Sequence, residues 1–495
     1  MAVHRFARRS RGRITVLVLV VAVAGVAACV PTVPTPTTPD YGLRTTLTPT
    51  GFVVSWNAPV DAPPDAIYDV QSKAGAGAWV DEPDAATTSA DVVGVPKTKH
   101  SFRVRLDSTT AWSEEASATF VIPVLPVLRI DTTGRAPIVD KETYLSGTIK
   151  LDPNGSPLPE YEGSTQIKGR GNSTWNHPKK PYRLKLASST ALGGMPKSKH
   201  WVLLANYLDA SQLRNATAFD LSSQTSLVWT PRYQFVEVVL NGSYDGVYML
   251  VEQVRGASDR VPITEMDSSD IEGEALTGGY LLEVDQYLEQ NSEPGWRTTQ
   301  NVPVVVKEPD PATPEQMEYA RSSIQAFEDA LFAPDFTNPD SGYRGFVDIA
   351  SMVDYYLLNE VTGNVDGFFS SAYLWKERSD PLLHFGPAWD FDASMGNALA
   401  TISPYWFWTR VSGPWLPRAF QDPWFNQQVV DRWNELRPAF QSVADQILAR
   451  ADSLAPAVAN DNARWARGVG DADQPAYVSH WLNERIGWLS TQYPG

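Results

Sequence analysis

Cysteine is almost absent from this sequence: Cys29 is the only one among 495 residues. A single thiol excludes a disulfide framework within the chain. Basic residues are also few relative to acidic ones, 41 against 57, and the formal net charge is -16. Because such a chain repels polyanions, we expect no nucleic-acid partner, and an anionic ligand has to meet a local basic patch.

Long repeats are missing, and the apolar run at residues 14–28 is too short for a comfortable membrane-spanning helix. Several Arg residues precede the run, and it ends in Val26-Ala-Ala-Cys29, which resembles a bacterial lipobox. We therefore predict that residues 1–28 are a lipoprotein signal peptide and that Cys29 is lipidated. The protein would then be an exported cell-envelope lipoprotein, anchored on the extracytoplasmic face of the bacterial membrane. An ordinary signal peptide or an uncleaved anchor is the alternative.

Two further segments precede the main domain. Residues 29–40 are rich in Pro and Thr, which predicts an extended linker. In residues 41–122, short runs of alternating polarity are separated by turn residues, which predicts a small all-β domain. The strand that ends at Trp56, with the Tyr68-Asp-Val and Phe102-Arg-Val-Arg strands, resembles a fibronectin type III module. The resemblance implies a sandwich that serves as a spacer or an adhesive module.

Residues 124–495 mix strand and helix patterns, so we predict an α+β domain. Its most basic segment runs from Lys168 to Arg183 and includes Arg170 and two glycines beside it. Glycine permits close approach of the backbone, and Lys and Arg supply charge-assisted donors, which suits a phosphate-binding loop. The alternative is a solvated turn followed by a basic strand.

Two acidic motifs follow apolar segments. Asn364-Val-Asp366 comes after an expected helix at 346–360, and Asp390 and Asp392 belong to a Trp-Asp-Phe-Asp motif. Apolar flanks would hold these carboxylates in place while the loops keep them accessible, as catalytic carboxylates require. Spacing alone favours the plainer interpretation that Asp366 and Asp392 are cap or turn residues.

Taken in order, these segments resemble the CotH-like (spore coat protein H) family of atypical kinases, over about residues 127–490. The resemblance rests on the basic loop and strand, three further segments with strand or turn character and the two acidic motifs, at residues 168–185, 203–215, 240–248, 279–285, 364–366 and 389–392. It implies an atypical protein-kinase-like, two-lobed domain at 124–495, with a smaller strand-rich lobe and a larger helical lobe.

The resemblance also implies the reaction, which is transfer of phosphate from ATP to Ser residues of a protein substrate at the cell surface or coat. Asp366 is similar to the catalytic-loop acid that orients the acceptor hydroxyl and takes its proton. Asp390, in a motif that looks like the kinase Asp-Phe-Gly, would hold the metal, and Asp392 would share it. Hard oxygen ligands suit Mg or Mn.

Roles for the nucleotide follow from the same resemblance. Lys168 and Arg170 would line the phosphates, and Lys185 is similar to the strand lysine that anchors them. The segment from Glu252 to Val254 resembles the hinge that meets adenine through its backbone.

The sequence departs from the kinase pattern in two places. Ser371 stands where kinases usually have an Asn that holds a second metal, and the expected helix at 211–223 has no Glu to pair with Lys185. An extracytoplasmic protein also meets little ATP. The main alternative is therefore a non-catalytic surface adhesion or envelope-structural protein on a kinase-like scaffold. Glycoside hydrolysis is a third hypothesis, favoured only by the many Trp and acidic residues.

Overall fold

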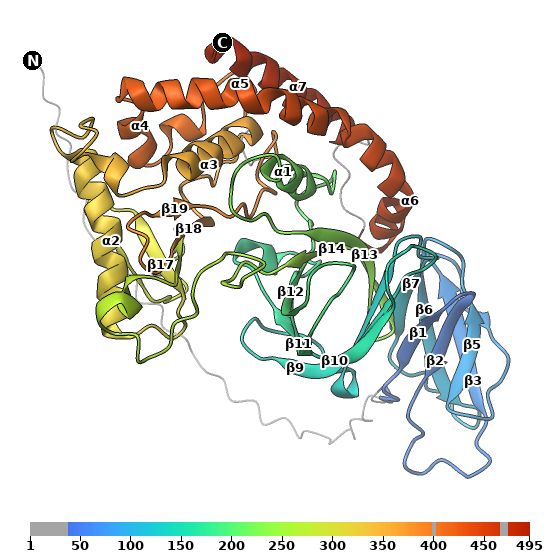
Figure 1. The fold of residues 1–495 in the computed structure, drawn as a ribbon. Coiled ribbons are helices and arrows are strands. Elements are labelled where there is room, and N and C mark those ends of the chain that lie inside the picture. The colour runs from blue at the N-terminus through green and yellow to red at the C-terminus, as the bar shows by residue number, and fades with distance from the viewer. Residues whose placement is uncertain (1–37, 398–401, 466–473) are drawn as a thin grey trace, which may run out of the picture.

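The computed structural model describes residues 38–397, 402–465 and 474–495. The predicted signal peptide, Cys29 and most of the predicted linker lie outside these residues. Along the chain, a small β domain is followed by a closed β-barrel, then a second sheet and a set of helices (Figure 1). The mixture of strands and helices confirms the predicted α+β class. In the described part of the chain, no helix has the length and apolar character needed to cross a membrane.

The small β domain consists of two antiparallel sheets with one shared core. Phe52 and Val54 from one sheet meet Phe102 and Val104 from the other, and all four side chains are buried. These residues alternate with more exposed ones, as the period-2 pattern of a half-buried strand requires. The first sheet has the order β1-β2-β5 and the second β4-β3-β6-β7, with bounds β1 Arg44–Thr48, β2 Gly51–Ser55, β3 Tyr68–Ala74, β4 Val80–Asp81, β5 Ser89–Val93, β6 Thr98–Leu106 and β7 Ala116–Phe120. The fibronectin type III assignment remains a prediction.

The barrel closes in the order β10-β11-β12-β14-β13-β8-β9, with β8 and β13 parallel and the other neighbours antiparallel. Its interior is filled by apolar side chains such as Ile149, Leu184 and Trp201, which are fully buried. The outward positions of β9, β10 and β11 are mostly polar, as in a strand with one solvent-facing side. Strands β13 and β14 are buried on both faces, because outward residues such as Met249 and Val251 join the large apolar core. The bounds are β8 Val127–Thr132, β9 Leu145–Asp152, β10 Tyr161–Gly169, β11 Tyr182–Thr190, β12 Ser198–Leu204, β13 Tyr233–Leu240 and β14 Ser243–Glu252.

The small domain packs directly on the barrel. Tyr244 of the barrel belongs to the core of the small domain, and the Leu47 amide donates to the Gly242 carbonyl at 2.8 Å. The buried carboxylate of Glu237 accepts from the backbone amides of Val124 and Leu125 at 2.5 and 2.9 Å. The connection between the two domains is therefore held by hydrogen bonds as well as by apolar contact.

The remaining elements share the largest apolar core. The second sheet has the order β16-β17-β15-β18-β19, with bounds β15 Tyr280–Val284, β16 Gly295–Arg297, β17 Pro303–Glu308, β18 Ala372–Lys376 and β19 His384–Phe385. Helix α3 lies under α5 and α7, and α2 flanks the sheet (Figure 1). The helices are α1 Arg214–Ser222, α2 Pro314–Phe332, α3 Ile349–Thr362, α4 Trp415–Ala419, α5 Pro423–Asp445, α6 Ile447–Trp465 and α7 Gln474–Gln492.

Candidate active site

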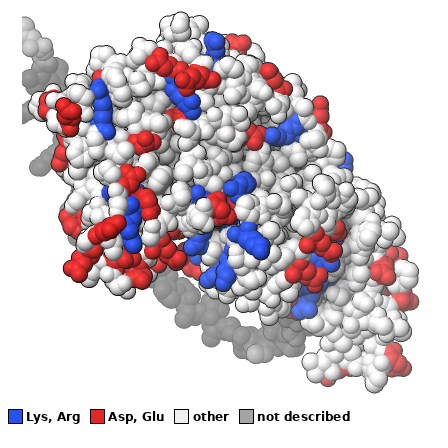
Figure 2. Space-filling model, in the orientation of Figure 1, with Lys and Arg blue, Asp and Glu red and all other residues white. Residues whose placement is uncertain are grey.

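A cavity of about 1240 Å³ lies between the barrel and the second sheet. Most of its cationic side chains come from barrel residues 141–183, and most of its carboxylates come from residues 283–392. Figure 2 shows Lys and Arg side chains grouped near the middle of the molecule, with acidic side chains beside them and toward α2. The cavity therefore has a mainly basic wall and a mainly acidic wall.

Asp366 lines the acidic wall just beyond the end of α3. The helix ends at Gly363, whose φ of 56° lies in the left-handed region that glycine adopts at little cost. The chain then turns through Asn364, whose side chain is held by Asn359 at 3.0 Å and accepts from the Asp366 amide at 3.2 Å. The Asp366 carbonyl accepts from the Ser370 amide at 2.8 Å. The turn thus presents the carboxylate from a rigid support, as expected from the apolar helix before it.

Asp390 and Asp392 lie on a loop that α1 holds in place. Phe391, between them, is fully buried, and its amide donates to the Asn215 side chain at 2.8 Å. Arg214, also buried, donates to the carbonyl of Ser394 at 3.0 Å. Asp390 itself has a φ of 64°, a left-handed conformation that Asp tolerates better than most residues. The apolar anchor and the α1 contacts fix the direction of both carboxylates.

The acidic side chains are close enough to perturb one another. Burial, Asp390 and Asp285, in that order, raise the pKa of Asp366 to about 6. Burial raises the pKa of Asp392 well above its usual range, and the charges of Asp390 and Asp366 add to this effect. The structure thus brings together the three acids that the sequence analysis singled out.

Two acidic residues of this wall were not predicted as site residues. Asp285, 3% exposed, accepts a hydrogen bond from Ser370 at 3.0 Å, and Glu283 lies beside it at the end of β15. Burial raises the pKa of Glu283 to about 7 despite an ion pair with Lys307 at 3.2 Å. Both acids belong to the 279–285 motif. Two carboxylates at the end of an apolar strand are the sequence signal that could have identified them as site residues.

The basic wall is built from the end of β10, the start of β11 and the loop between them. Arg170 lies 5.4 Å from the ring centroid of Trp389, next to Asp390, and the charge of Asp390 acts on its guanidinium. Lys168 lies 4.9 Å from the ring of Tyr144. Gly171 has a φ of 85°, so glycine is needed where the loop turns back toward β11. Both predicted phosphate-lining residues therefore face the cavity.

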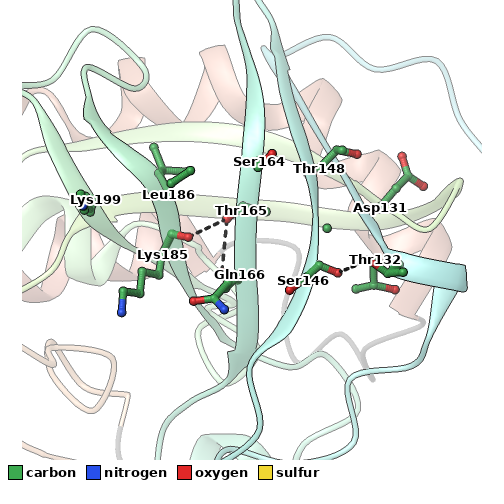
Figure 3. A pocket seen from close by; sticks show the side chains of 13 residues that line it. Asp131, Thr132, Ser146, Thr148, Ser164, Thr165, Gln166, Lys185, Leu186 and Lys199 are labelled. Carbon is green, nitrogen blue, oxygen red and sulfur yellow. Dashed lines mark hydrogen bonds between the residues drawn. The ribbon is translucent and has the colours of Figure 1, made fainter.

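The other predicted nucleotide residues lie elsewhere. Lys185 lies in a separate groove of about 680 Å³ on the outer face of the barrel, beside Gln166 (Figure 3). Glu252 is fully buried and accepts from the Arg232 amide at 3.1 Å, while Val254 is part of the large apolar core. The structure does not bring these three residues to the cavity, and their nucleotide roles stay predictions.

The departures noted in the sequence have structural counterparts. The hydroxyl of Ser371 donates to the Asp390 carboxylate at 3.1 Å, so this residue supports an acid of the cavity. Helix α1, shorter than the expected 211–223, supplies Arg214 and Asn215 to the Asp390 loop. Its role in the described structure is to hold that loop.

We expect Asp285→Asn to lower the pKa of Asp366, because it removes one of the negative charges that raise it. Carboxyl carbon shifts of metal-free protein, titrated by NMR and assigned with Asp366→Asn, measure this pKa. Asp340→Asn, at an exposed loop position, is the control and should leave it near 6. A pKa that stays the same or rises in Asp285→Asn contradicts the proximity of the two acids.

The same shift has a consequence for stability. The folded protein keeps the Asp366 proton up to a pH of about 6, whereas an ordinary Asp carboxyl releases it near 3.8. Between these two values the folded state binds more protons than the unfolded chain. The contribution of Asp366 to the free energy of unfolding therefore falls as the pH rises through this window.

The residues fit a divalent cation by their chemistry. Within the residues that the structure describes, no three His, Cys, Asp or Glu side chains are already gathered at metal-binding distances. Yet Asp390, Asp392 and Asp366 repel one another, and a cation between them relieves that repulsion. Their carboxylates are the hard oxygen donors that Mg and Mn prefer.

Comparison with known proteins assigns the chain to a family. No curated protein matches it. The family model described as CotH kinase protein matches residues 167–489, well over half of the chain. The match covers the basic loop between β10 and β11 and both acidic motifs, and it confirms the resemblance found in the sequence. The chain is therefore a kinase-like member of the CotH kinase protein family.

Proposed function

We propose that this protein is a phosphotransferase that moves the terminal phosphate of ATP to Ser residues of a protein. The observation that supports this most directly is the cavity with its two opposed walls. A nucleoside triphosphate is strongly anionic, and the cations of the basic wall would balance the charge of its phosphates. The acids on the other side serve the metal and the acceptor hydroxyl.

Asp366 is the proposed catalytic acid/base. With a pKa of about 6, its carboxylate is largely ionised at neutral pH and still basic enough to accept a proton from a bound hydroxyl. Its carboxylate orients the Ser hydroxyl toward the phosphate and takes the hydroxyl proton as the new O–P bond forms. The bond to the leaving diphosphate then breaks, so the transfer needs no covalent enzyme intermediate.

Asp390 and Asp392 are the proposed ligands of Mg or Mn. When bound, the metal ion neutralises charge on the phosphates. Arg170 and Lys168 hold phosphate oxygens from the opposite wall, and the Ser371 hydroxyl keeps Asp390 oriented. In this proposal the barrel corresponds to the smaller lobe of a kinase-like fold, and the second sheet with its helices corresponds to the larger lobe.

The setting of the reaction is part of the proposal. The lipobox-like Val26-Ala-Ala-Cys29 supports a lipid anchor at Cys29 and a place on the extracytoplasmic face of the membrane. The Pro/Thr segment and the small β domain would act as the spacer between the anchor and the catalytic domain. The acceptor would be a protein of the cell surface or coat. The strong negative charge supports a protein rather than a nucleic acid as the partner.

Calorimetric titration of the full chain with ATP tests this function. We expect binding that requires Mg or Mn and is lost in Asp390→Ala, because the variant removes a proposed metal ligand. Asp340→Ala, an exposed acid on a loop, is the matched control and should bind as the native protein does. Absence of nucleotide binding with either metal contradicts the proposed function and favours a binding or structural role at the cell surface.

A further inference from the structure

We propose that Arg183, on β11, is the strand cation that holds the phosphates of the donor nucleotide. This inference rests on the proposed function and deepens it. Arg183 lines the large cavity, whereas Lys185, two residues farther on, lies in the outer groove of the barrel. In the register of the barrel, Arg183 pairs with Lys168, and Lys185 pairs with Gln166.

Arg183 belongs to a cluster of cations that repel one another. The charge of Arg183 lowers the pKa of Lys168, after the larger effect of burial, and it acts in the same direction on Arg170. In the described part of the chain, none of these three cations forms an ion pair with a carboxylate. A concentration of unpaired positive charge in a protein of net charge -16 is the local basic patch that an anionic ligand requires.

The guanidinium of Arg183 is also incompletely satisfied. Its Nε atom is shielded from solvent and has no hydrogen-bond acceptor among the residues that the structure describes. The charge of Arg183 acts to lower the pKa of the Tyr144 phenol, against the larger effect of burial, which raises it. A buried donor without an acceptor costs free energy, and a bound anion recovers part of that cost. The ligand class that fits is a phosphate chain, because a guanidinium presents parallel donors to phosphate oxygens.

The position on β11 explains why Arg183 reaches the cavity. Side chains of Tyr182 and Leu184 fill the barrel interior, so Arg183 lies on the outward face. At this end of the strand the outward face meets the loop of Arg170, whose amide donates to the Pro181 carbonyl at 3.1 Å. Two residues farther along β11, the outward side chain no longer lines the cavity, so Lys185 lies in the outer groove.

The test is calorimetric titration of the full chain with ATP and Mg, and separately with inorganic tripolyphosphate. We expect Arg183→Ala to weaken the binding of both probes by about tenfold to a hundredfold, the loss of a charge-assisted hydrogen bond. Lys199→Ala removes an exposed cation of the outer groove on the neighbouring strand β12; it is the matched control and should bind both probes as the native chain does. Lys185→Ala tests the other cation of β11 and should weaken binding less than Arg183→Ala does. Arg183→Lys keeps the positive charge but loses the parallel N–H donors of the guanidinium, so it should weaken binding to an intermediate degree. Thermal melts followed by circular dichroism check that each variant is folded.

The outcomes separate this inference from the proposed function. If the native chain binds ATP and the folded Arg183 variants bind it equally well, the inference is wrong and the proposed function stands. Weaker binding in Lys185→Ala but not in the Arg183 variants also overturns the inference. A loss confined to ATP, with tripolyphosphate binding unchanged, overturns it as well, because Arg183 would then contact another part of the nucleotide. If the native chain binds neither probe, the proposed function fails and the inference fails with it.

Discussion

Asp366→Asn is expected to lower the rate of phosphate transfer by about 10²–10⁴-fold, the range typical of a lost general base. The amide has nearly the same shape as the carboxylate but cannot accept the hydroxyl proton. The backbone of Asp366 makes the contacts that hold its turn, to Asn364 and Ser370, and these remain in the variant. The measurement is incorporation of radiolabelled phosphate from ATP into protein.

Binding measurements distinguish this role from a structural one. Asp366→Asn should bind ATP with Mg at least as well as the native chain, because removal of one negative charge from a crowded acidic wall favours an anion. Asp340→Asn is the control for transfer and should behave as the native chain. Transfer at the native rate in Asp366→Asn contradicts the assignment of this residue. If Asp366→Asn loses both nucleotide binding and phosphate transfer, Asp366 has a structural role in the site and is not the general base.

Asp461→Ala should reduce the free energy of unfolding by about 3–5 kcal/mol, the cost of leaving a buried charge without its partner. The Asp461 carboxylate, on α6, is fully buried and accepts from Lys179 at 2.7 Å, from the Val247 amide at 2.9 Å and from Gln212 at 3.0 Å. It therefore joins α6, the barrel, and the basic loop that lines the cavity. Denaturant unfolding followed by fluorescence measures the change.

Two comparisons sharpen this prediction. Asp452→Ala replaces an exposed acid on the same helix, and it should change stability by less than about 0.5 kcal/mol. In Asp461→Ala combined with Lys179→Met, the buried charge is gone, so part of the lost stability should return. If Asp461→Ala is no more destabilising than Asp452→Ala, the buried pair does not hold the helix to the barrel.

Several elements were predictable because their local signals are strong. Helix α2 begins after Thr313, which forms a capping box with Gln316, and Pro314 occupies its first position. The Asn-Gly at 241–242 joins β13 and β14 as a hairpin turn. Helix α3 spans Ile349–Thr362, so it begins three residues after the start of the expected 346–360 and ends two residues after its end. Capping residues and turn residues act within a few positions, so the sequence carries their effect directly.

The candidate site was predictable only in part. Asp366, Asp390, Asp392, Lys168 and Arg170 were recognised by motif, and the structure brings all five to one cavity. Lys185 was assigned to the phosphates by its place in the motif. Lys185 and Arg183 share one face of β11, so periodicity cannot distinguish them. Only the tertiary structure distinguishes them: Arg183 lies at the end of β11 that the second sheet approaches and lines the cavity, whereas Lys185 lies in the outer groove.

The amino-acid sequence alone determined the negative charge of this protein, its α+β class, the motifs of its family and the types of side chain at the site. These follow from residue identity and from interactions a few positions long. Tertiary structure alone decided that Asp285 and Glu283 join the acids of residues 366–392, and that Arg183 rather than Lys185 faces them. Residues far apart in the chain become neighbours through the closure of the barrel and its packing against the second sheet. Local patterns do not encode those contacts.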